Sequence, residues 1–161
     1  MRFTTQAEYG LICALHLAKN GGDGPVAARE MSEIEGLPSD YTEKILRRLR
    51  QAGLVNSIRG VSGGFELARA PEKITVRDVI VATEGTTFEV NCETHKVDPN
   101  TRCGERHDCS IRPVWLALKD RIDGLLDRIR LSDLVEQRES EMEELIDVTW
   151  EDESSREATP A

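Results

Sequence analysis

The stretch of sequence that decides the fold is LPSDYTEKILRRLRQAGLVNSIRGVSGGFELAR, residues 37–69. Its first half has apolar residues at helical spacing, with Ser39 or Asp40 as the expected N-terminal cap and Gly53 as the expected end. Its second half holds two short runs typical of strands, joined by glycines and a serine as in a hairpin. A helix followed by such a hairpin is the order of the third helix and the wing of a winged helix-turn-helix.

Two more helices are predicted before this stretch. Residues 5–8, Thr-Gln-Ala-Glu, have the pattern of a capping box at the start of a helix that a run of Asn and Gly residues ends. In the second helix, Ala28, Met31 and Ile34 recur every three residues before a glycine ends the pattern. Helix, helix, turn, helix and hairpin together predict a mainly α-helical protein whose residues 1–84 form a winged helix-turn-helix domain.

A long helix is predicted after this domain. Thr75 is the expected cap of a short fourth helix, and the polar loop of residues 85–112 follows it. Pro113 then opens a helix of about 20 residues, or roughly 30 Å. One of its faces is apolar and consists of Val114, Leu118, Ile122, Leu125, Leu126 and Ile129. A helix this one-sided needs a partner surface, so we predict that residues 113–149, with a further helix from about Ser132, form a homodimer.

The charges of the chain are unevenly distributed. The net charge is -9, yet residues 136–161 alone carry 10 acidic against 2 basic residues. We expect the acidic end of this segment, residues 150–161, to be disordered. From Lys44 to Phe65 there is no acidic residue. In a winged helix-turn-helix the third helix enters the major groove of double-stranded DNA and the wing reaches phosphates or the minor groove, so this basic stretch predicts a DNA-binding surface.

The residues expected to contact DNA lie in the first turns of the third helix, along its basic flank and in the wing. They are Ser39, Tyr41, Glu43, Lys44, Arg47, Arg48 and Arg59. We expect Tyr41, Glu43 and Lys44 to include the base contacts, and Arg48 and Arg59 to bind phosphates. A homodimer would present two such helices to successive half-sites, so a roughly palindromic operator is predicted. The simpler alternative for a run of charges is a solvated helix face.

Three of the four cysteines, Cys92, Cys103 and Cys109, lie in a polar loop where little could bury them. The chain shows no secretory signal pattern, so we expect it in the cytoplasm, where clustered thiols more often bind metal or carry redox chemistry than form disulfides. Their spacing leaves three explanations open: a zinc site completed by His95 or His107, a disulfide framework, or an iron–sulfur cluster.

The first helix carries two more residues with reactive side chains. Cys13 shares a face with Tyr9 and Leu17, so we expect a buried structural thiol. His16 is expected on the surface of the helix or at an interface.

No catalytic constellation is present in the sequence, which has no Ser/His/Asp set, phosphate-binding loop or paired carboxylates. No apolar stretch approaches the roughly 20 residues that span a bilayer. The sequence therefore predicts a DNA-binding regulator, a repressor or an activator, and not an enzyme. The alternative is an electron-transfer or redox module that uses the winged helix as a scaffold for protein interactions, but such a module has no need of the acid-free basic stretch.

Several segments together resemble one known family over roughly residues 1–135. They are MRFTTQAEYGLICALHLA, the stretch quoted at the start, ITVRDVIVATEG, the three-cysteine loop and CSIRPVWLALKDRIDGLLDRIRLSDL. These segments resemble the Rrf-two family of bacterial winged-helix regulators, which includes a regulator of iron–sulfur cluster assembly and a sensor of nitric oxide. The resemblance implies a dimeric transcription factor whose cluster tunes DNA affinity, with Cys92, Cys103 and Cys109 as the thiolate ligands.

The fourth ligand differs from both of these family members. The assembly regulator has a histidine three residues after the third cysteine, where this chain has Arg112, and a guanidinium cannot ligate. The nitric oxide sensor uses an aspartate on the first helix of the other subunit, and Glu8 stands at that position here. Three cysteines and a carboxylate fit a 4Fe-4S cluster, while a 2Fe-2S cluster that uses Glu8, His95 or His107 stays open. The simpler role for Glu8 is the acid of the capping box.

Overall fold

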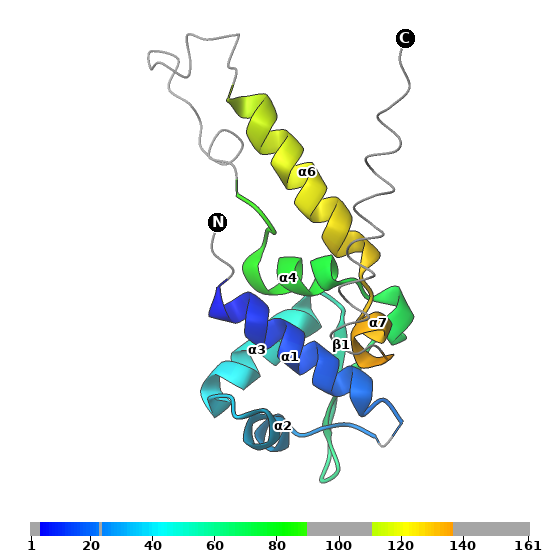
Figure 1. Cartoon of the computed structure of the whole chain (residues 1–161). Coiled ribbons are helices and arrows are strands. Elements are labelled where there is room, and N and C mark those ends of the chain that lie inside the picture. Colours follow the sequence, from blue (N-terminus) through cyan, green and yellow to red (C-terminus); the bar gives the residue numbers. More distant parts are fainter. Residues whose placement is uncertain (1–3, 23, 90–110, 137–161) are drawn as a thin grey trace.

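The fold consists of helices and one small hairpin, and the computed structural model describes it over residues 4–22, 24–89 and 111–136 (Figure 1). The elements in chain order are α1 (Thr5–Lys19), α2 (Ala28–Glu35), α3 (Ser39–Gln51), β1 (Val55–Ile58), β2 (Gly64–Leu67), the 3-10 turn η1 (Pro71–Lys73), α4 (Val76–Glu84), α6 (Arg112–Arg128) and α7 (Leu131–Glu136). This order confirms the predicted mainly helical winged helix-turn-helix with a long additional helix.

The hydrophobic core lies where α1, α3 and α4 meet. Its most buried members include Cys13, Leu17, Met31, Ile45, Leu46, Leu49, Ile74, Val79 and Leu131. The apolar positions of α3 recur at helical spacing, so they share one side while its cations share the other. Ile34, which the period of α2 grouped with Met31, is 63% exposed, so α2 contributes less to the core than its pattern predicted.

Two of the predicted helix caps are wrong. The N-cap of α1 is Thr4, whose hydroxyl accepts a hydrogen bond from the amide of Gln6 at 3.1 Å. Because the helix begins one residue earlier than its sequence pattern predicted, Glu8 is not in the position of a capping-box acid. The N-cap of α3 is Pro38, with no side-chain cap. Ser39 therefore belongs to the helix itself.

Other helix ends are confirmed. In α4, the Thr75 hydroxyl accepts from the amide of Asp78 at 2.9 Å, while the Asp78 carboxylate accepts from the amide of Thr75 at 3.1 Å. This reciprocal pair is a capping box. Gly36 and Gly53 follow α2 and α3 with φ of +67° and +71°, a left-handed backbone that glycine adopts at little cost.

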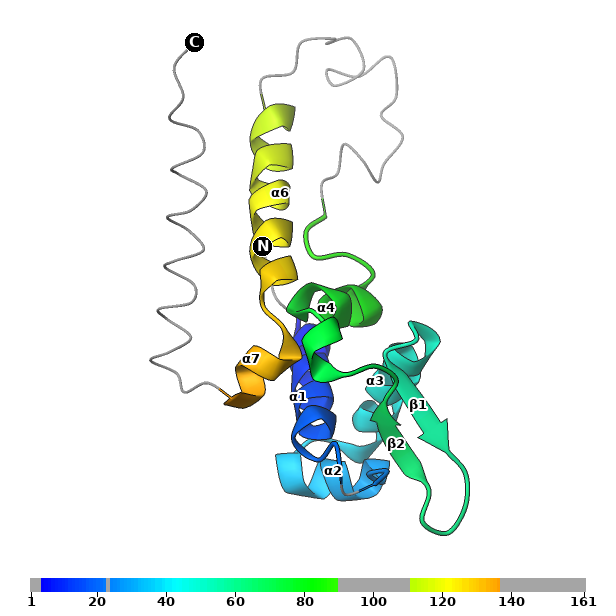
Figure 2. The same ribbon diagram turned by 90° about the vertical axis from the view of Figure 1, so that its right-hand side faces the viewer.

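The hairpin of β1 and β2 forms the wing and is antiparallel, with Val55 opposite Leu67 and Ile58 opposite Gly64. An isolated bridge adds Val26 to its edge, since the amide and carbonyl of Phe65 both bond to Val26, at 2.8 and 2.9 Å. In Figures 1 and 2 the hairpin turn points to the end of the molecule opposite to the free end of α6.

The long helix α6 leaves the helical body as a projecting rod and the chain then returns to it (Figure 2). Ile111, Val114, Trp115 and Leu118, at its beginning, are exposed. After α6, the carbonyl of Ile129 accepts from the amide of Val76 at 2.9 Å, and the amide of Leu131 donates to the carbonyl of Ile74 at 3.0 Å. Leu131 is therefore part of the main core, although the sequence grouped it with the dimerisation segment. The remainder of that segment, residues 137–149, and the predicted acidic tail lie outside the described residues.

Candidate nucleic-acid interface

The exposed side of α3 brings most of the predicted DNA-contacting residues together. Ser39, Glu43, Lys44 and Arg47 are all exposed. They stand opposite the buried Ile45, Leu46 and Leu49. Polar and charged side chains are thus presented by a helix whose other side is fixed in the core.

The predicted base contact Tyr41 lies at the edge of this surface. It is half-buried, and its ring meets the ring of Tyr9 edge to face, with centroids 5.5 Å apart. Such aromatic pairs add stability beyond the buried area. Tyr41 therefore joins the first turns of α3 to α1, and only part of its side chain is available to a ligand.

A recess of about 400 Å³ separates the third helix from the wing. It is lined by Ala28, Glu43, Arg47, Arg50 and Phe65. The Nη1 atom of Arg50 donates to the Ser57 hydroxyl of β1 at 3.1 Å, which fixes one guanidinium at the mouth of the recess. Two arginines beside a ring are well suited to bind a phosphate of a nucleic-acid backbone.

Arg50 lines the recess but is not among the DNA-contacting residues predicted from the sequence. It follows Arg47 by three residues, a spacing that places two side chains on neighbouring positions of one helix face. The hydrogen bond to Ser57 depends on the pairing of the wing with α3, which no local pattern reveals.

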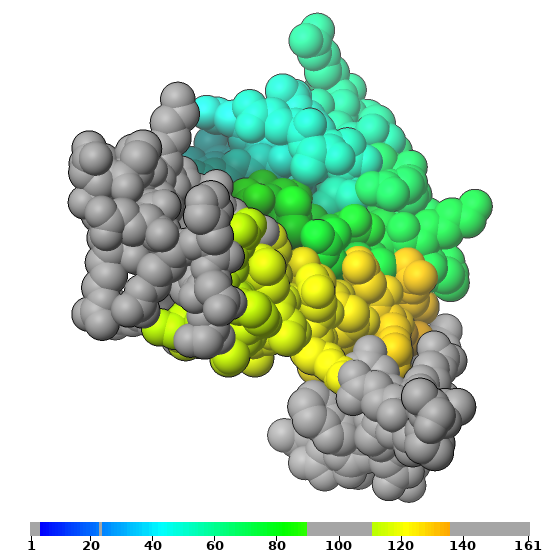
Figure 3. Space-filling view, turned by 90° about the horizontal axis from the view of Figure 1, so that it is seen from above, coloured from blue at the N-terminus to red at the C-terminus, as the bar shows by residue number. Residues whose placement is uncertain are grey.

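The turn of the wing holds Arg59 and Val61, both exposed, and Val61 is fully so. In the space-filling view from above, the wing stands out as a narrow projection (Figure 3). In winged-helix proteins, a cation at the end of such a projecting hairpin can reach the DNA backbone or a groove next to the recognition helix.

Arg48, a predicted phosphate contact, lies on the other flank of α3. Its Nη1 atom donates to the carbonyl of Thr83 in α4 at 2.5 Å and to the side-chain carbonyl of Gln6 in α1. The structure thus brings Arg48 to the neighbouring helices and not to the recess.

The predicted cluster ligands fall into two groups. Cys92, Cys103 and Cys109, with the alternative ligands His95 and His107, lie outside the described residues. Glu8 is exposed on α1, and no hydrogen bond or ion pair occupies it within the described part of the chain. A free surface carboxylate is able to serve as an iron ligand for a second subunit. Elsewhere in the described ranges, no group of three or more His, Cys, Asp and Glu residues could hold a metal ion.

Cys13 and His16, two further titratable residues of α1, are buried. Cys13 is fully buried, which confirms the predicted buried thiol. Burial, reinforced by the charge of Glu35, raises the pKa of this thiol to about 12. His16 was expected on the surface of the helix or at an interface, but it is only 6% exposed and lies inside the domain, where its Nδ1 is 2.6 Å from Oε1 of Glu35. The prediction was wrong because the partner that makes this burial possible is on another helix.

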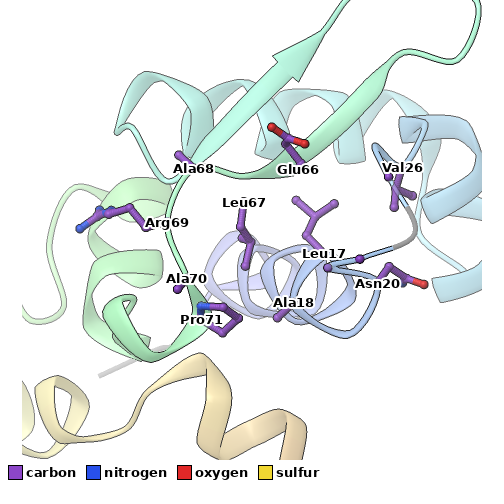
Figure 4. Close-up of a pocket in the computed structure, with 13 residues that line it drawn as sticks. Leu17, Ala18, Asn20, Val26, Glu66, Leu67, Ala68, Arg69, Ala70 and Pro71 are labelled. Carbon is purple, nitrogen blue, oxygen red and sulfur yellow. The ribbon is translucent and has the colours of Figure 1, made fainter.

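A second hollow, of about 630 Å³, lies between the end of α1 and the base of the wing (Figure 4). Leu17, Val26 and Leu67 contribute apolar walls, and Arg69 extends away from the other labelled side chains. No set of polar groups converges on it, so it does not compare with the recess beside α3 as a binding site.

Comparisons with known proteins agree with this arrangement. The family described as "Rrf2: Iron-dependent Transcriptional regulator" matches residues 3–137. The transcriptional regulator IscR of Photorhabdus laumondii is 34% identical over 139 residues, which are 86% of this chain and 82% of the relative. The transcriptional regulator CymR of Bacillus subtilis is 32% identical over 143 residues, 89% of this chain and 96% of the relative.

Solved structures of the same two kinds of regulator are similar to this fold. T. potens IscR superposes with a TM-score of 0.66 and 34% identity, covering 84% of this chain and 86% of that chain. CymR, titled the global cysteine regulator of B. subtilis, gives a TM-score of 0.65 and 32% identity, covering 84% and 96%. These relatives are transcriptional regulators and not enzymes, as predicted. The chain therefore belongs to the Rrf2 family of transcriptional regulators.

Proposed function

We propose that the chain is a homodimeric regulator that binds a roughly palindromic operator in double-stranded DNA, with an iron–sulfur cluster that tunes its affinity. The observation that carries the proposal is the exposed polar side of α3 next to the wing, at the end of the molecule away from α6. Arg47, Arg50 and Arg59 supply the phosphate contacts. Ser39, Glu43 and Lys44 face the bases from the first turns of α3, with Tyr41 at their edge.

The dimer is proposed from the exposed apolar beginning of α6. In Figure 3 the atoms of α6 are exposed across the centre of the upper face. Four large apolar side chains are exposed together at this end of the helix, and exposed apolar patches often mark protein–protein contacts. A second α6 offers the same surface in return, as two-fold symmetry requires.

Cys92, Cys103 and Cys109 would hold the cluster, and Glu8 of the other subunit would complete the ligand set. Thiolates are the usual ligands of such clusters. A carboxylate is a harder donor that binds iron less tightly, so its site would be the first to react with oxygen or nitric oxide. The IscR relatives and the family description support a cluster, while CymR is described as a cysteine regulator.

The test is to purify the protein without oxygen and measure its absorption spectrum, iron and acid-labile sulfide. We expect visible absorption, because thiolate-to-iron charge transfer absorbs visible light. Alanine at Cys92, Cys103 or Cys109 should each remove the colour, while Cys13→Ala, the matched control, should keep it. Colourless protein with stoichiometric zinc after anaerobic reconstitution would refute the cluster, and colourless protein without metal would favour a CymR-like regulator.

Glu8→Gln tests the fourth ligand. The structure makes this variant easy to interpret, because Glu8 caps no helix. We expect the cluster of Glu8→Gln to be lost faster in air than that of the unmodified protein, with no change in thermal unfolding of the metal-free form. If the clusters of Glu8→Gln and of the unmodified protein last equally long in air, Glu8 is not the fourth ligand, and His95 or His107 becomes the next candidate.

A further inference from the structure

The last turn of α4 contacts two other helices at once, and we name its residues Thr83 and Glu84 the α4 joint. The carboxylate of Glu84 accepts a hydrogen bond from the amide of Ala7 at 3.0 Å and another from the hydroxyl of Thr4. The amide of Ala7 also donates to the carbonyl of Thr4 at 3.1 Å, so Glu84 is a second acceptor at the start of α1, where amides lack i−4 partners within the helix. The α4 joint therefore reinforces the N-terminal end of α1.

Where the α4 joint faces α1, the two helices are packed without free space between them. A Cβ atom added at Gly10 would lie 2.6 Å from the methyl carbon of Thr83. Thr83 is buried, and its hydroxyl donates to the carbonyl of Val79 at 3.0 Å. Because Thr83 is held by this hydrogen bond and Gly10 leaves room for no larger residue, α1 and α4 are closely packed here.

Arg48 attaches α3 to this unit. Its guanidinium donates to the Thr83 carbonyl at 2.5 Å and to Gln6, so a single Nη1 atom reaches both α4 and α1. Carbonyls in the last turn of a helix lack intrahelical partners and carry partial negative charge, which favours a cation beside them. One nitrogen of the Arg48 guanidinium is thus held by the protein itself, although the residue is exposed.

We propose that Arg48 is a positioning residue that sets the orientation of α3, and that it does not contact DNA. The inference rests on the proposed function of α3 as the helix that enters the groove. Tyr41 fixes the first turns of α3 to α1 through Tyr9, and Arg48 fixes its later turns to the α4 joint.

The segment that follows the α4 joint contacts α6. Two residues after Gly85, the hydroxyl of Thr87 donates to the carboxylate of Asp123 in α6. The ring of Phe88 lies 6.4 Å, centroid to centroid, from that of Trp115. A change in how α6 sits against α4 therefore has a path of direct contacts to the helix that faces DNA.

The experiment compares Arg48→Gln with Arg47→Gln, a change of equal charge one residue away on the same helix. Binding is measured over a range of salt concentrations to two duplexes, one selected by the unmodified protein from a random library and one scrambled. We expect Arg47→Gln to reduce the slope of log affinity against log salt by about one unit on both duplexes. Arg48→Gln should leave the slope unchanged and lower the ratio of selected to scrambled affinity by about tenfold.

Gly10→Ala disturbs the joint without removing charge and should lower the same ratio at an unchanged slope. Circular dichroism fixes a temperature at which every variant is folded; if Gly10→Ala fails to fold, Arg48→Gln decides alone. A reduced slope for Arg48→Gln would make it a phosphate contact and overturn the proposal, as would an unchanged ratio. If the proposed DNA-binding function itself is wrong, the unmodified protein will select no duplex from the library. This result differs from every outcome named for Arg48→Gln.

Discussion

At the scale of single residues, Cys13 gives a prediction about pH. Burial raises the pKa of its thiol to about 12, whereas in the unfolded chain the thiol ionises near its ordinary value of 9.0. Between these two values the folded protein holds a proton that the unfolded chain releases, so stability falls as pH rises. The loss approaches about 1.4 kcal/mol for each pH unit in this range.

Urea unfolding at pH 8 and pH 10 under reducing conditions measures this loss. Cys13→Ala should be less stable at both pH values, because it leaves a small cavity, but it should lose less stability between them. Both proteins contain the same three loop cysteines, so the contribution of these thiols to the pH dependence is the same in both and drops out of the comparison. An identical pH dependence for the two proteins would mean that Cys13 does not stay protonated in the fold.

Residues whose role depends on a local pattern were predicted well from the sequence. The burial of Cys13 and the helix cap at Thr75 follow from neighbours within one turn. His16 and Arg48 were not predictable in this way, because their partners Glu35 and Thr83 lie on other helices, 19 and 35 positions away.

At the scale of elements, the turn of the wing depends on Gly63 for its shape. A Cβ atom at Gly63 would lie 2.3 Å from the carbonyl oxygen of Ile58 and 2.9 Å from that of Gly60. Both are backbone atoms and cannot rotate away. We expect Gly63→Ala to distort the turn and lower DNA affinity by about tenfold, with little change in the thermal unfolding midpoint. Gly22→Ala is the matched control, since a Cβ there meets nothing within 4 Å.

The helices and the wing were predictable because each has its own period or turn signal. The recess between α3 and β2 was not, since it arises only when Phe65 pairs with Val26 and the hairpin lies across the start of α2. The cap of α1 was misplaced by one residue because Thr4 and Thr5 have the same side chain. The cap of α3 was misplaced because Ser39 and Asp40 are residue types that commonly cap helices, whereas the helix begins at Ser39 behind Pro38, which offers no side-chain cap.

At the scale of the whole molecule, the apolar beginning of α6 predicts the oligomeric state. Leu118→Glu places a charge in the exposed apolar segment and should convert a dimer into a monomer, as measured by light scattering after size exclusion. Its affinity for a palindromic duplex should fall by roughly 100-fold, because the two half-sites are no longer bound together. Asp120→Lys, an exposed change on the other side of α6, should remain dimeric. If the unmodified protein is itself a monomer in this measurement, the proposed dimer is wrong.

The return of the chain after α6 has a consequence for synthesis on the ribosome. Leu131 fills the core between α1 and η1, so the first and last described elements complete one interior. A polypeptide released early, at any point before α7, lacks this side chain and leaves Ile74 without its cover. We expect such fragments to fold poorly and to be degraded, so that prematurely terminated products do not compete with finished protein for operators.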